Sequence, residues 1–301
     1  MARWKAIVLM MVGAFCYGTQ SPMIKIALQQ GFIIQDISSS AIVFGCLLLW
    51  IFTIPALADL KKYSYKTIAV VLFVGSVLGL TEIFYMLTLA RIPASLAVVL
   101  LFQFTWMTQI VHMLQTRSGL SKRRWIAVGC ILVGTYFASE AMLRQLFPFN
   151  AWGIVLGLLS AFTYTLSILI SASVGTHMNQ LVRSSLMLTG QMVLVLMVFS
   201  PTFAFVKVVT AGLWKWAGLI GLTGFVITTY AYNKAIPHVG VSLAGVLGSI
   251  ELPVVIFLSA VVLRESISAT QWLGIGMILL GIVIADYGGR ILLKKKSGIK
   301  F

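Results

Sequence analysis

Apolar stretches of about 20 residues recur along the whole chain, separated by short polar segments. A helix needs roughly 20 apolar residues to cross a bilayer core of about 30 Å. Ten stretches meet this length, at residues 4–27, 38–58, 66–90, 93–116, 122–141, 151–174, 181–201, 213–234, 238–263 and 269–289. The fourth and ninth begin with Ile-Pro, and the prolines Pro93 and Pro237 suit the first turn of a helix. The pattern predicts an all-α integral membrane protein with ten transmembrane helices and no soluble domain.

The composition agrees with this class. Of the 301 residues, 60% are hydrophobic and only 10% are charged, and the mean hydropathy is +1.02. A soluble domain of this size has no interior large enough for so much apolar surface. Cys16, Cys46 and Cys130 lie inside apolar stretches and have no metal-ligand spacing, and His177 and His238 add none. We therefore expect no metal and no cofactor.

The chain contains an internal repeat. Residues 117–134 (RSGLSKRRWIAVGCILVG) match residues 264–281 (RESISATQWLGIGMILLG) at seven of eighteen positions, 147 residues apart. The matches include an arginine, a tryptophan and two spaced glycines, which unrelated apolar helices seldom share in register. Weaker matches extend the repeat over the chain with offsets of 144 to 147, which predicts two copies, residues 1–146 and 147–301.

Two consecutive copies of five spans must lie in the membrane with opposite orientation, because five is an odd number. Lys and Arg concentrate in cytoplasmic loops, and a cytoplasmic N-terminus places 16 of the 22 basic residues on the cytoplasmic side. The basic run Lys122, Arg123 and Arg124 also becomes Ala269, Thr270 and Gln271 in the second copy. The charges predict two inverted repeats with both termini in the cytoplasm and no nucleic-acid partner.

The second copy resembles the EamA-type module of the drug/metabolite transporter superfamily. The resemblance is carried by residues 234–237 (KAIP), 250–253 (IELP), 263–265 (LRE) and 274–281 (GIGMILLG), and by the opening segment 13–25 (GAFCYGTQSPMIK). It implies a ten-helix carrier of small metabolites, usually an exporter, whose central cavity is lined by spans one, three, four, six, eight and nine. The first copy departs from the pattern, with Trp106 near the position of Pro253 and Ser118 in place of Glu265.

Two carboxylates lie near the middle of predicted spans. Glu82 belongs to the third span and Glu251 to the ninth, whereas Asp36, Asp59, Glu140, Glu265 and Asp286 lie at or near span ends, where we expect them to be solvated or to cap helices. A carboxylate within a bilayer costs roughly 2.5 to 3.5 kcal/mol and needs a partner, water or a function. Burial favours the protonated form. Glu82 is therefore a candidate for proton exchange or for contact with a cationic substrate, and the alternative is a neutral, hydrogen-bonded acid. Glu251 is a weaker candidate, since it precedes Pro253 and can stabilise a helix bend there.

Bulky polar side chains inside the apolar stretches are the candidate substrate ligands, because a polar group in a membrane faces protein or water rather than lipid. They are Tyr17, Gln20, Glu82, Tyr85, Gln103, Gln109, Tyr164, Ser167, Tyr230, Tyr232 and Asn233. His112 is a further candidate for proton coupling because histidine titrates near neutral pH. Serine and threonine in the same helices serve equally well as contacts between helices.

The features together predict a secondary transporter of the cell membrane that exports a small metabolite, such as an amino acid, by alternating access with proton coupling or exchange. Uptake or facilitated diffusion of a cationic compound is the alternative within transport, and a non-transporting membrane subunit is the alternative outside it. The chain has no phosphate-binding glycine loop, and no nucleophile, base or metal ligands are spaced for catalysis. We therefore expect a non-enzyme, acting as a monomer or homodimer with a small-molecule substrate and the lipid bilayer as its partners.

Overall fold

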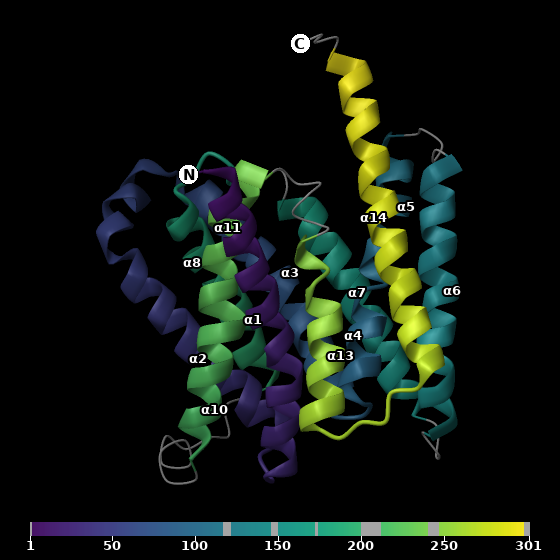
Figure 1. Cartoon of the computed structure of the whole chain (residues 1–301). Helices are drawn as coiled ribbons and strands as arrows, with labels where there is room; N and C mark the ends of the chain where they lie inside the picture. Colours follow the sequence, from purple (N-terminus) through teal and green to yellow (C-terminus); the bar gives the residue numbers. More distant parts are fainter. Residues whose placement is uncertain are drawn as a thin grey trace.

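The structure is a computed structural model that describes residues 2–116, 122–145, 150–171, 174–199, 212–239 and 247–297. Within these ranges the chain folds into helices and contains no strand, as Figure 1 shows. The helices from the first copy are α1 (Arg3–Gln29), α2 (Ile34–Thr53), its 3₁₀ extension η1 (Ile54–Lys62), α3 (Tyr65–Leu89), α4 (Ala94–Leu101), α5 (Phe104–Thr116) and α6 (Lys122–Gln145). Those from the second are α7 (Ala151–Ser171), α8 (Gln180–Val198), α10 (Leu213–Ile220), the π-helical η2 (Gly221–Ile227), α11 (Thr228–Val239), α13 (Glu251–Val262) and α14 (Ala269–Ser297).

Five of the described helical segments are long and apolar enough to cross a membrane: α1, α2 with η1, α3, α7 and α8. Shorter apolar segments lie at Ala94–Thr108, Trp125–Ala138, Glu251–Val262 and Ala269–Ile284. Large apolar side chains such as Leu47, Phe73 and Met197 are more than half exposed, which suits contact with lipid. The all-α, multi-pass class is therefore confirmed, while the number of ten crossings stays a prediction.

Two spans differ from their expected form, the fourth at one place and the ninth at two. The fourth was expected to be one continuous helix, but it is broken between α4 and α5 at Phe102 and Gln103. Pro237 was expected to begin the ninth span but lies inside α11, near its last turn. Pro253 is the third residue of α13, so its missing N–H falls in the first turn, where a helix has no partner for it. A turn at Ser249 and Ile250 interrupts the helix directly before Glu251, close to where the bend was expected, and the role of Glu251 in that bend stays a prediction.

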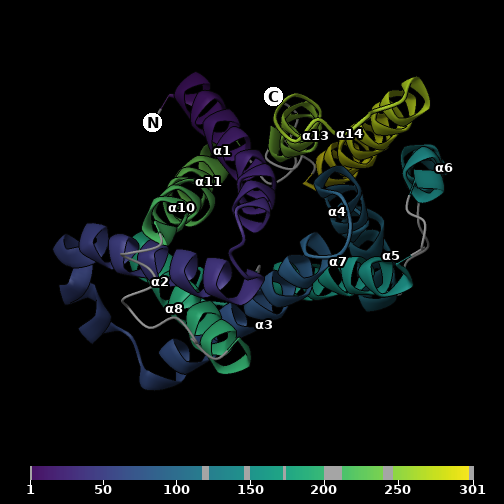
Figure 2. The ribbon, with the colours of Figure 1, turned by 90° about the horizontal axis from the view of Figure 1, so that it is seen from below.

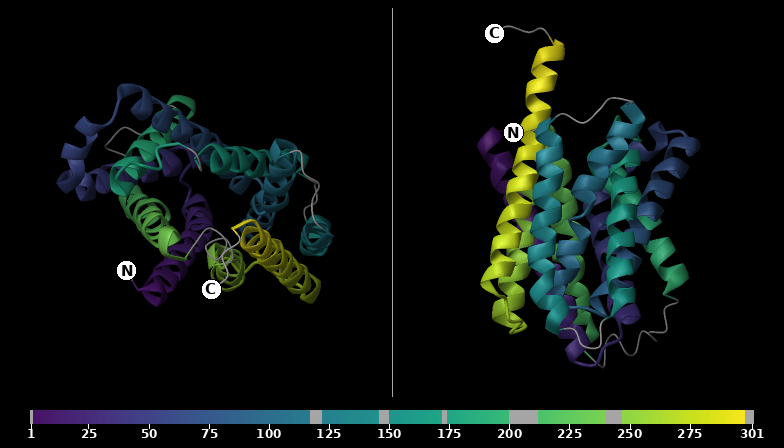
Figure 3. Two further views of the ribbon diagram at one scale, coloured as in Figure 1. Left: turned by 90° about the horizontal axis from the view of Figure 1, so that it is seen from above. Right: turned by 90° about the vertical axis from the view of Figure 1, so that its right-hand side faces the viewer.

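The two copies are interlocked rather than placed side by side. Helix α1 packs against α11 and α13, α3 packs against α7 and α8, and α6 packs along α14. Figures 1 and 3 both show the last pair lying together, and Figure 2 shows α1, α4 and α13 as neighbours when the molecule is seen from below. Each copy thus buries its helices against those of the other.

Contacts at glycines repeat the symmetry of the sequence. A Cβ at Gly134 would lie 2.9 Å from the Ile278 side chain, and a Cβ at Gly281 would lie 2.7 Å from the Ile131 side chain. These positions are equivalent, since 281 − 134 and 278 − 131 both equal 147. Because contacts near the start of one helix fall near the end of the other, α6 and α14 are antiparallel and meet through the same residues of each copy, as a two-fold contact requires.

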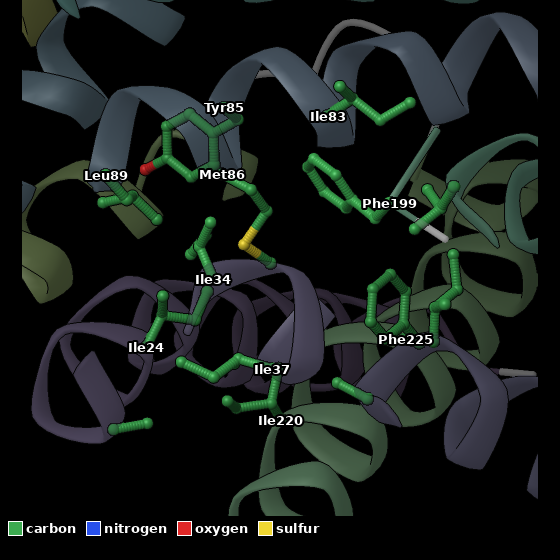
Figure 4. Packing of buried hydrophobic residues seen from close by; sticks show 14 of the residues in the cluster. Ile24, Ile34, Ile37, Ile83, Tyr85, Met86, Leu89, Phe199, Ile220 and Phe225 are labelled. Atoms are coloured by element: carbon green, nitrogen blue, oxygen red, sulfur yellow. The ribbon is translucent and has the colours of Figure 1, made fainter. Parts of the chain in front are cut away.

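The largest core cluster joins α1, α2, α3 and the α10–η2 segment. It includes Ile24, Ile37, Met86, Leu89 and Ile220, all fully buried, and Figure 4 shows the side chains of α3 facing those of the neighbouring helices. The glycine pairs Gly75/Gly79 and Gly153/Gly157 lie at helix contacts too, the first pair on α8 and the second on Ile92 and Leu100. This packing fixes α1 and α3, which carry the candidate site.

Candidate functional site

The carboxylates Glu82 and Glu251 are both buried and belong to one cluster. Glu82 lies on α3 with 6% of its surface exposed, and Glu251 is the first residue of α13 with 9% exposed. Tyr17 of α1 lies close enough to both carboxyl groups to interact with them electrostatically. Helices from the two copies therefore bring together the two acids that the sequence places 169 residues apart (251 − 82).

Four tyrosines interact electrostatically with one or both acids. Tyr17 also interacts with Tyr85 of α3 and Tyr164 of α7, and Tyr232 of α11 interacts with Glu251, Tyr164 and the thiol of Cys16. The ionisable groups that interact with Tyr17 and Tyr232 are carboxyls, other phenols and one thiol. We call this set, Tyr17, Glu82, Tyr85, Tyr164, Tyr232 and Glu251, the acid–tyrosine cluster. Its charge and aromatic faces suit a proton or a cationic group.

Close contacts hold the helices around the acid–tyrosine cluster. The Ser21 and Tyr85 hydroxyls are 2.8 Å apart and join α1 to α3, and Thr81 donates to Thr163 at 3.0 Å and joins α3 to α7. At Gly18 a Cβ would lie 2.8 Å from the Val254 side chain, so α1 and α13 approach each other too closely there for a larger residue. The cluster is thus built on rigid, packed helices rather than on loops.

One carboxyl oxygen of the acid–tyrosine cluster lacks a hydrogen bond. Oε1 of Glu82 is buried and has no hydrogen-bond partner within the described part of the chain. A buried carboxylate oxygen without a partner carries a desolvation cost of about 1 to 3 kcal/mol or more. A proton on the carboxyl group, or a donor from a ligand, removes this cost. Glu82 is therefore the acid best placed to bind a ligand donor or to exchange a proton.

Other predicted ligands lie elsewhere. Gln103 occupies the break between α4 and α5, where it donates to the Val99 carbonyl and the Thr135 hydroxyl and accepts from the Trp106 indole N–H. Tyr230 is 39% exposed on α11 and accepts a hydrogen bond from Lys234. The structure brings neither residue to the acid–tyrosine cluster.

The remaining predicted residues are placed as follows. Gln20 is buried on α1 and packs against Gly224 of η2, and Ser167 donates to the Tyr164 carbonyl of its own helix. The side chains of Gln109, His112 and Asn233 lie outside the described residues. Ser21 was not among the candidates, although it lies one helical turn from Tyr17 and helical spacing alone would have placed it on the same face.

The described residues contain no group of three or more His, Cys, Asp or Glu side chains that could hold a metal ion. Glu265, which was expected at a span end as a solvated or capping residue, accepts hydrogen bonds from the first turn of α4. The expected capping role is confirmed.

The fold and the buried polar site define a multi-pass helical membrane protein built from two copies of one module. The sequence profile of the EamA-like transporter family matches residues 4–139 and 151–285. The chain belongs to the EamA-like transporter family, and it is a membrane transporter of the drug/metabolite transporter superfamily.

The fold also occurs in solved structures. One protein known from a crystal structure is similar over 97% of this chain and 99% of its own, with a TM-score of 0.67 and 14% sequence identity. At this identity the likeness concerns the fold alone. None of the curated protein sequences is significantly similar to this chain.

Proposed function

We propose that this transporter exports a small metabolite with a cationic amino group, such as an amino acid, by alternating access. The observation that carries the proposal is the acid–tyrosine cluster, which combines two buried carboxyl groups with four tyrosines from both copies. Carboxylates pair with an ammonium group, and aromatic rings attract cations. An inverted repeat supports alternating access because one fold, presented in both orientations, has two similar arrangements, one open to each side.

Coupling to protons, or exchange of substrates, provides the driving force in this proposal. Glu82 has a buried oxygen without a hydrogen-bond partner in the described part of the chain. A proton and an ammonium group therefore compete for the same carboxyl group. Alternate binding of the two as the cluster changes sides would couple their movements.

The proposed location is the cell membrane, with both termini in the cytoplasm. The positive-inside count of 16 basic residues against 6 supports this orientation. Reporter fusions at the two ends test it, because a reporter that is active only in the cytoplasm should be active at both. Activity of such a reporter at only one terminus would contradict an even number of crossings.

The test of transport begins with metabolite profiling of cells with and without overexpression. The metabolites that change are then used for counterflow in liposomes containing the purified protein. We expect Glu82→Gln to lose flux driven by a pH gradient while keeping counterflow. Asp59→Asn is the matched control: it also removes one carboxylate, but from a contact with Lys62 and Asn179, so it should loosen that contact and leave pH-driven flux and counterflow unchanged. Equal loss in both variants would contradict the role given to Glu82.

Uptake or facilitated diffusion of a cationic compound is the second candidate. The same unpartnered oxygen of Glu82 favours it, because a fixed cation can satisfy that atom without any proton movement. In this case Glu82→Gln weakens substrate binding at every pH, and no pH gradient drives flux in the unaltered protein. If no metabolite moves and the protein purifies with a stoichiometric partner, a role as a non-transporting subunit replaces both proposals.

A further inference from the structure

The first turn of α4 is capped from the other copy. Its preceding residue is Pro93, whose side chain offers no acceptor, so the first N–H groups of the helix need a partner from elsewhere. Glu265 supplies it. Oε1 accepts from the Ala94 N–H at 3.0 Å, and Oε2 accepts from the Ser95 N–H at 3.4 Å and from the Ser95 hydroxyl. One carboxylate of the second copy therefore binds three donors of the first.

The chain around Glu265 is shaped to reach α4. Glu265 follows the C-terminus of α13, and its own N–H donates to the Ser259 carbonyl at 3.1 Å. Arg264 adopts a left-handed backbone with φ of 55°, a conformation that non-glycine residues rarely accept without a structural reason. This turn directs the Glu265 carboxylate toward the first turn of α4.

The contact lies at the end of the helices opposite the N-terminus. Glu265 lines a pocket of about 280 Å³ together with Lys25 and Gln29 near the end of α1 and with residues 90–93 before α4. Lys25 also interacts electrostatically with Glu265. Further along α4, Val98 and Val99 share an apolar cluster with Leu252 and Val255 of α13. Figures 1 and 2 show the linker of residues 263–268 running across this end of the molecule.

The equivalent contact is not encoded at the other end. The position that corresponds to Glu265 in the first copy is residue 118, since 265 − 147 = 118, and it is a serine. No Asp or Glu occurs anywhere between residues 110 and 139. A symmetric carrier would close both ends with equal strength. The carboxylate of this contact is therefore encoded in the second copy alone.

We propose that Glu265 is a latch that holds the end of the transport pathway opposite the N-terminus closed, and that this end opens when α4 is released from Glu265. The inference rests on the alternating-access cycle proposed above. Opening at this end separates helices of the two copies, and the Glu265 contact joins the copies at that place. Lys25 is positioned to pair with the carboxylate once α4 has left it.

Thiol labelling tests the latch without any substrate. The reporter is Cys16, which lies beside Tyr232 in the acid–tyrosine cluster, in a background where Cys46 and Cys130 are alanine. A membrane-impermeant maleimide is added from outside the cell. We expect Glu265→Ala to raise the labelling rate by at least about tenfold, since one hydrogen bond to a charged group is worth roughly that factor in an equilibrium.

Matched variants separate the latch from general loosening of the fold. Glu265→Gln and Ser95→Ala each keep part of the contact and should give smaller increases. Arg264→Gly is the neighbouring control, because glycine accepts a φ of 55° without strain, and it should label like the parent. Unchanged labelling in Glu265→Ala, Glu265→Gln and Ser95→Ala overturns the proposal, as does an equal increase in Arg264→Gly.

Cross-linking gives the opposite perturbation. Ser95→Cys with Glu265→Cys, joined by oxidation or by a short bifunctional thiol reagent, should abolish counterflow, and cleavage of the link should restore it. The control pair is Thr53→Cys with Ser185→Cys, whose native hydroxyls are 2.8 Å apart between α2 and α8 and whose link should leave counterflow intact. Retained counterflow in the first pair overturns the latch.

The two proposals fail in different ways. If labelling responds to Glu265 as expected and no metabolite ever moves, the latch stands and the proposed transport function is wrong. If a metabolite moves and neither labelling nor cross-linking changes as described, the transport function stands and the latch is wrong.

Discussion

At the scale of single residues, hydroxyl groups define how the acid–tyrosine cluster is held. The Ser21–Tyr85 contact joins α1 to α3 beside the two carboxyl groups, and Tyr85 is only 6% exposed. The Tyr85 hydroxyl provides the Ser21 hydroxyl with a hydrogen-bond partner. Such a pair adds stability and keeps the ring in one orientation.

Tyr85→Phe should lower the free energy of unfolding by about 1 kcal/mol, because one buried hydrogen bond is lost and the Ser21 hydroxyl loses its partner. Thermal denaturation in detergent measures the change. Tyr230→Phe is the control, since Tyr230 is partly exposed and contacts Lys234 on the surface. An equal melting temperature in both variants would show that the buried bond adds nothing.

A second prediction concerns Asp59 on the surface. Hydrogen bonds from Lys62 and from Asn179 hold the pKa of Asp59 below its ordinary value of 3.8. A lowered pKa means that the carboxylate stabilises the fold above its ordinary pKa, and that this stabilisation is lost as the pH falls through the lowered value. Proteolysis of residues 174–179 should therefore stay constant between about pH 5 and 8, and Asp59→Asn should raise it throughout that range. A rise in the unaltered protein near pH 6 would contradict this account.

The sequence predicts well that bulky polar residues in apolar helices face protein rather than lipid. Tyr17, Glu82 and Tyr164 are bulky polar groups in apolar helices, so they had to face protein, and Tyr17 interacts with the other two; that they bind substrate stays a prediction. The prediction of Gln103 as a ligand rested on the same logic and stays a prediction; its amide joins α4 to α6 at the break in the fourth span. Polarity alone does not distinguish these two uses.

At the scale of helices, close approach depends on particular glycines. A Cβ at Gly75 would overlap the backbone of Met187, and a Cβ at Gly190 would overlap that of Leu72, so α3 and α8 touch through their backbones. Equivalent positions, Gly221 and Gly45, serve the contact between η2 and α2. Helices of the two copies thus meet at matching glycines.

Gly75→Leu should therefore force α3 and α8 apart and cost at least about 1 to 3 kcal/mol through overpacking. Gly129→Ala is the matched control, since no atom lies within 4 Å of a Cβ there and alanine favours helix. Yield and melting temperature of the purified proteins give the comparison. If Gly75→Leu folds as well as Gly129→Ala, the contact is looser than described.

Helix ends were harder to predict than helix existence. The break after α4 occurs in the sequence Leu-Phe-Gln-Phe, which contains neither glycine nor proline. Pro237 lies inside α11, although a proline there removes one backbone hydrogen bond of the helix. Local signals therefore failed where contacts with other helices decide the end.

At the scale of the whole molecule, the two copies form one structural unit. Contacts of α1 with α11 and α13, of α3 with α7 and α8, and of α6 with α14 all cross from one copy to the other. The repeat could be found in the sequence, because glycines and tryptophans recur in register. Which helix of one copy packs on which helix of the other could not, since every helix presents similar apolar surfaces.

Residues 1–146 and 147–301 expressed as separate chains should reveal this dependence. We expect neither half to purify as a folded protein alone, because each leaves its contact surfaces uncovered. Produced together, with an affinity tag on one half, they should purify as a pair and regain counterflow. Independent folding of either half would mean that the contacts between copies are dispensable.

The break between α4 and α5 has a mechanical consequence. Helix α4 has eight residues and is therefore about 12 Å long, with Gln103 joining it to α5 and α6 at one end and Glu265 at the other. Polar contacts therefore hold this short helix at both of its ends. A short helix held at both ends can change its angle without a tilt of α5, so we expect one end of the protein to open while the helices at the opposite end keep their contacts. The broken span thus permits local movement where a continuous helix would have to rock as a whole.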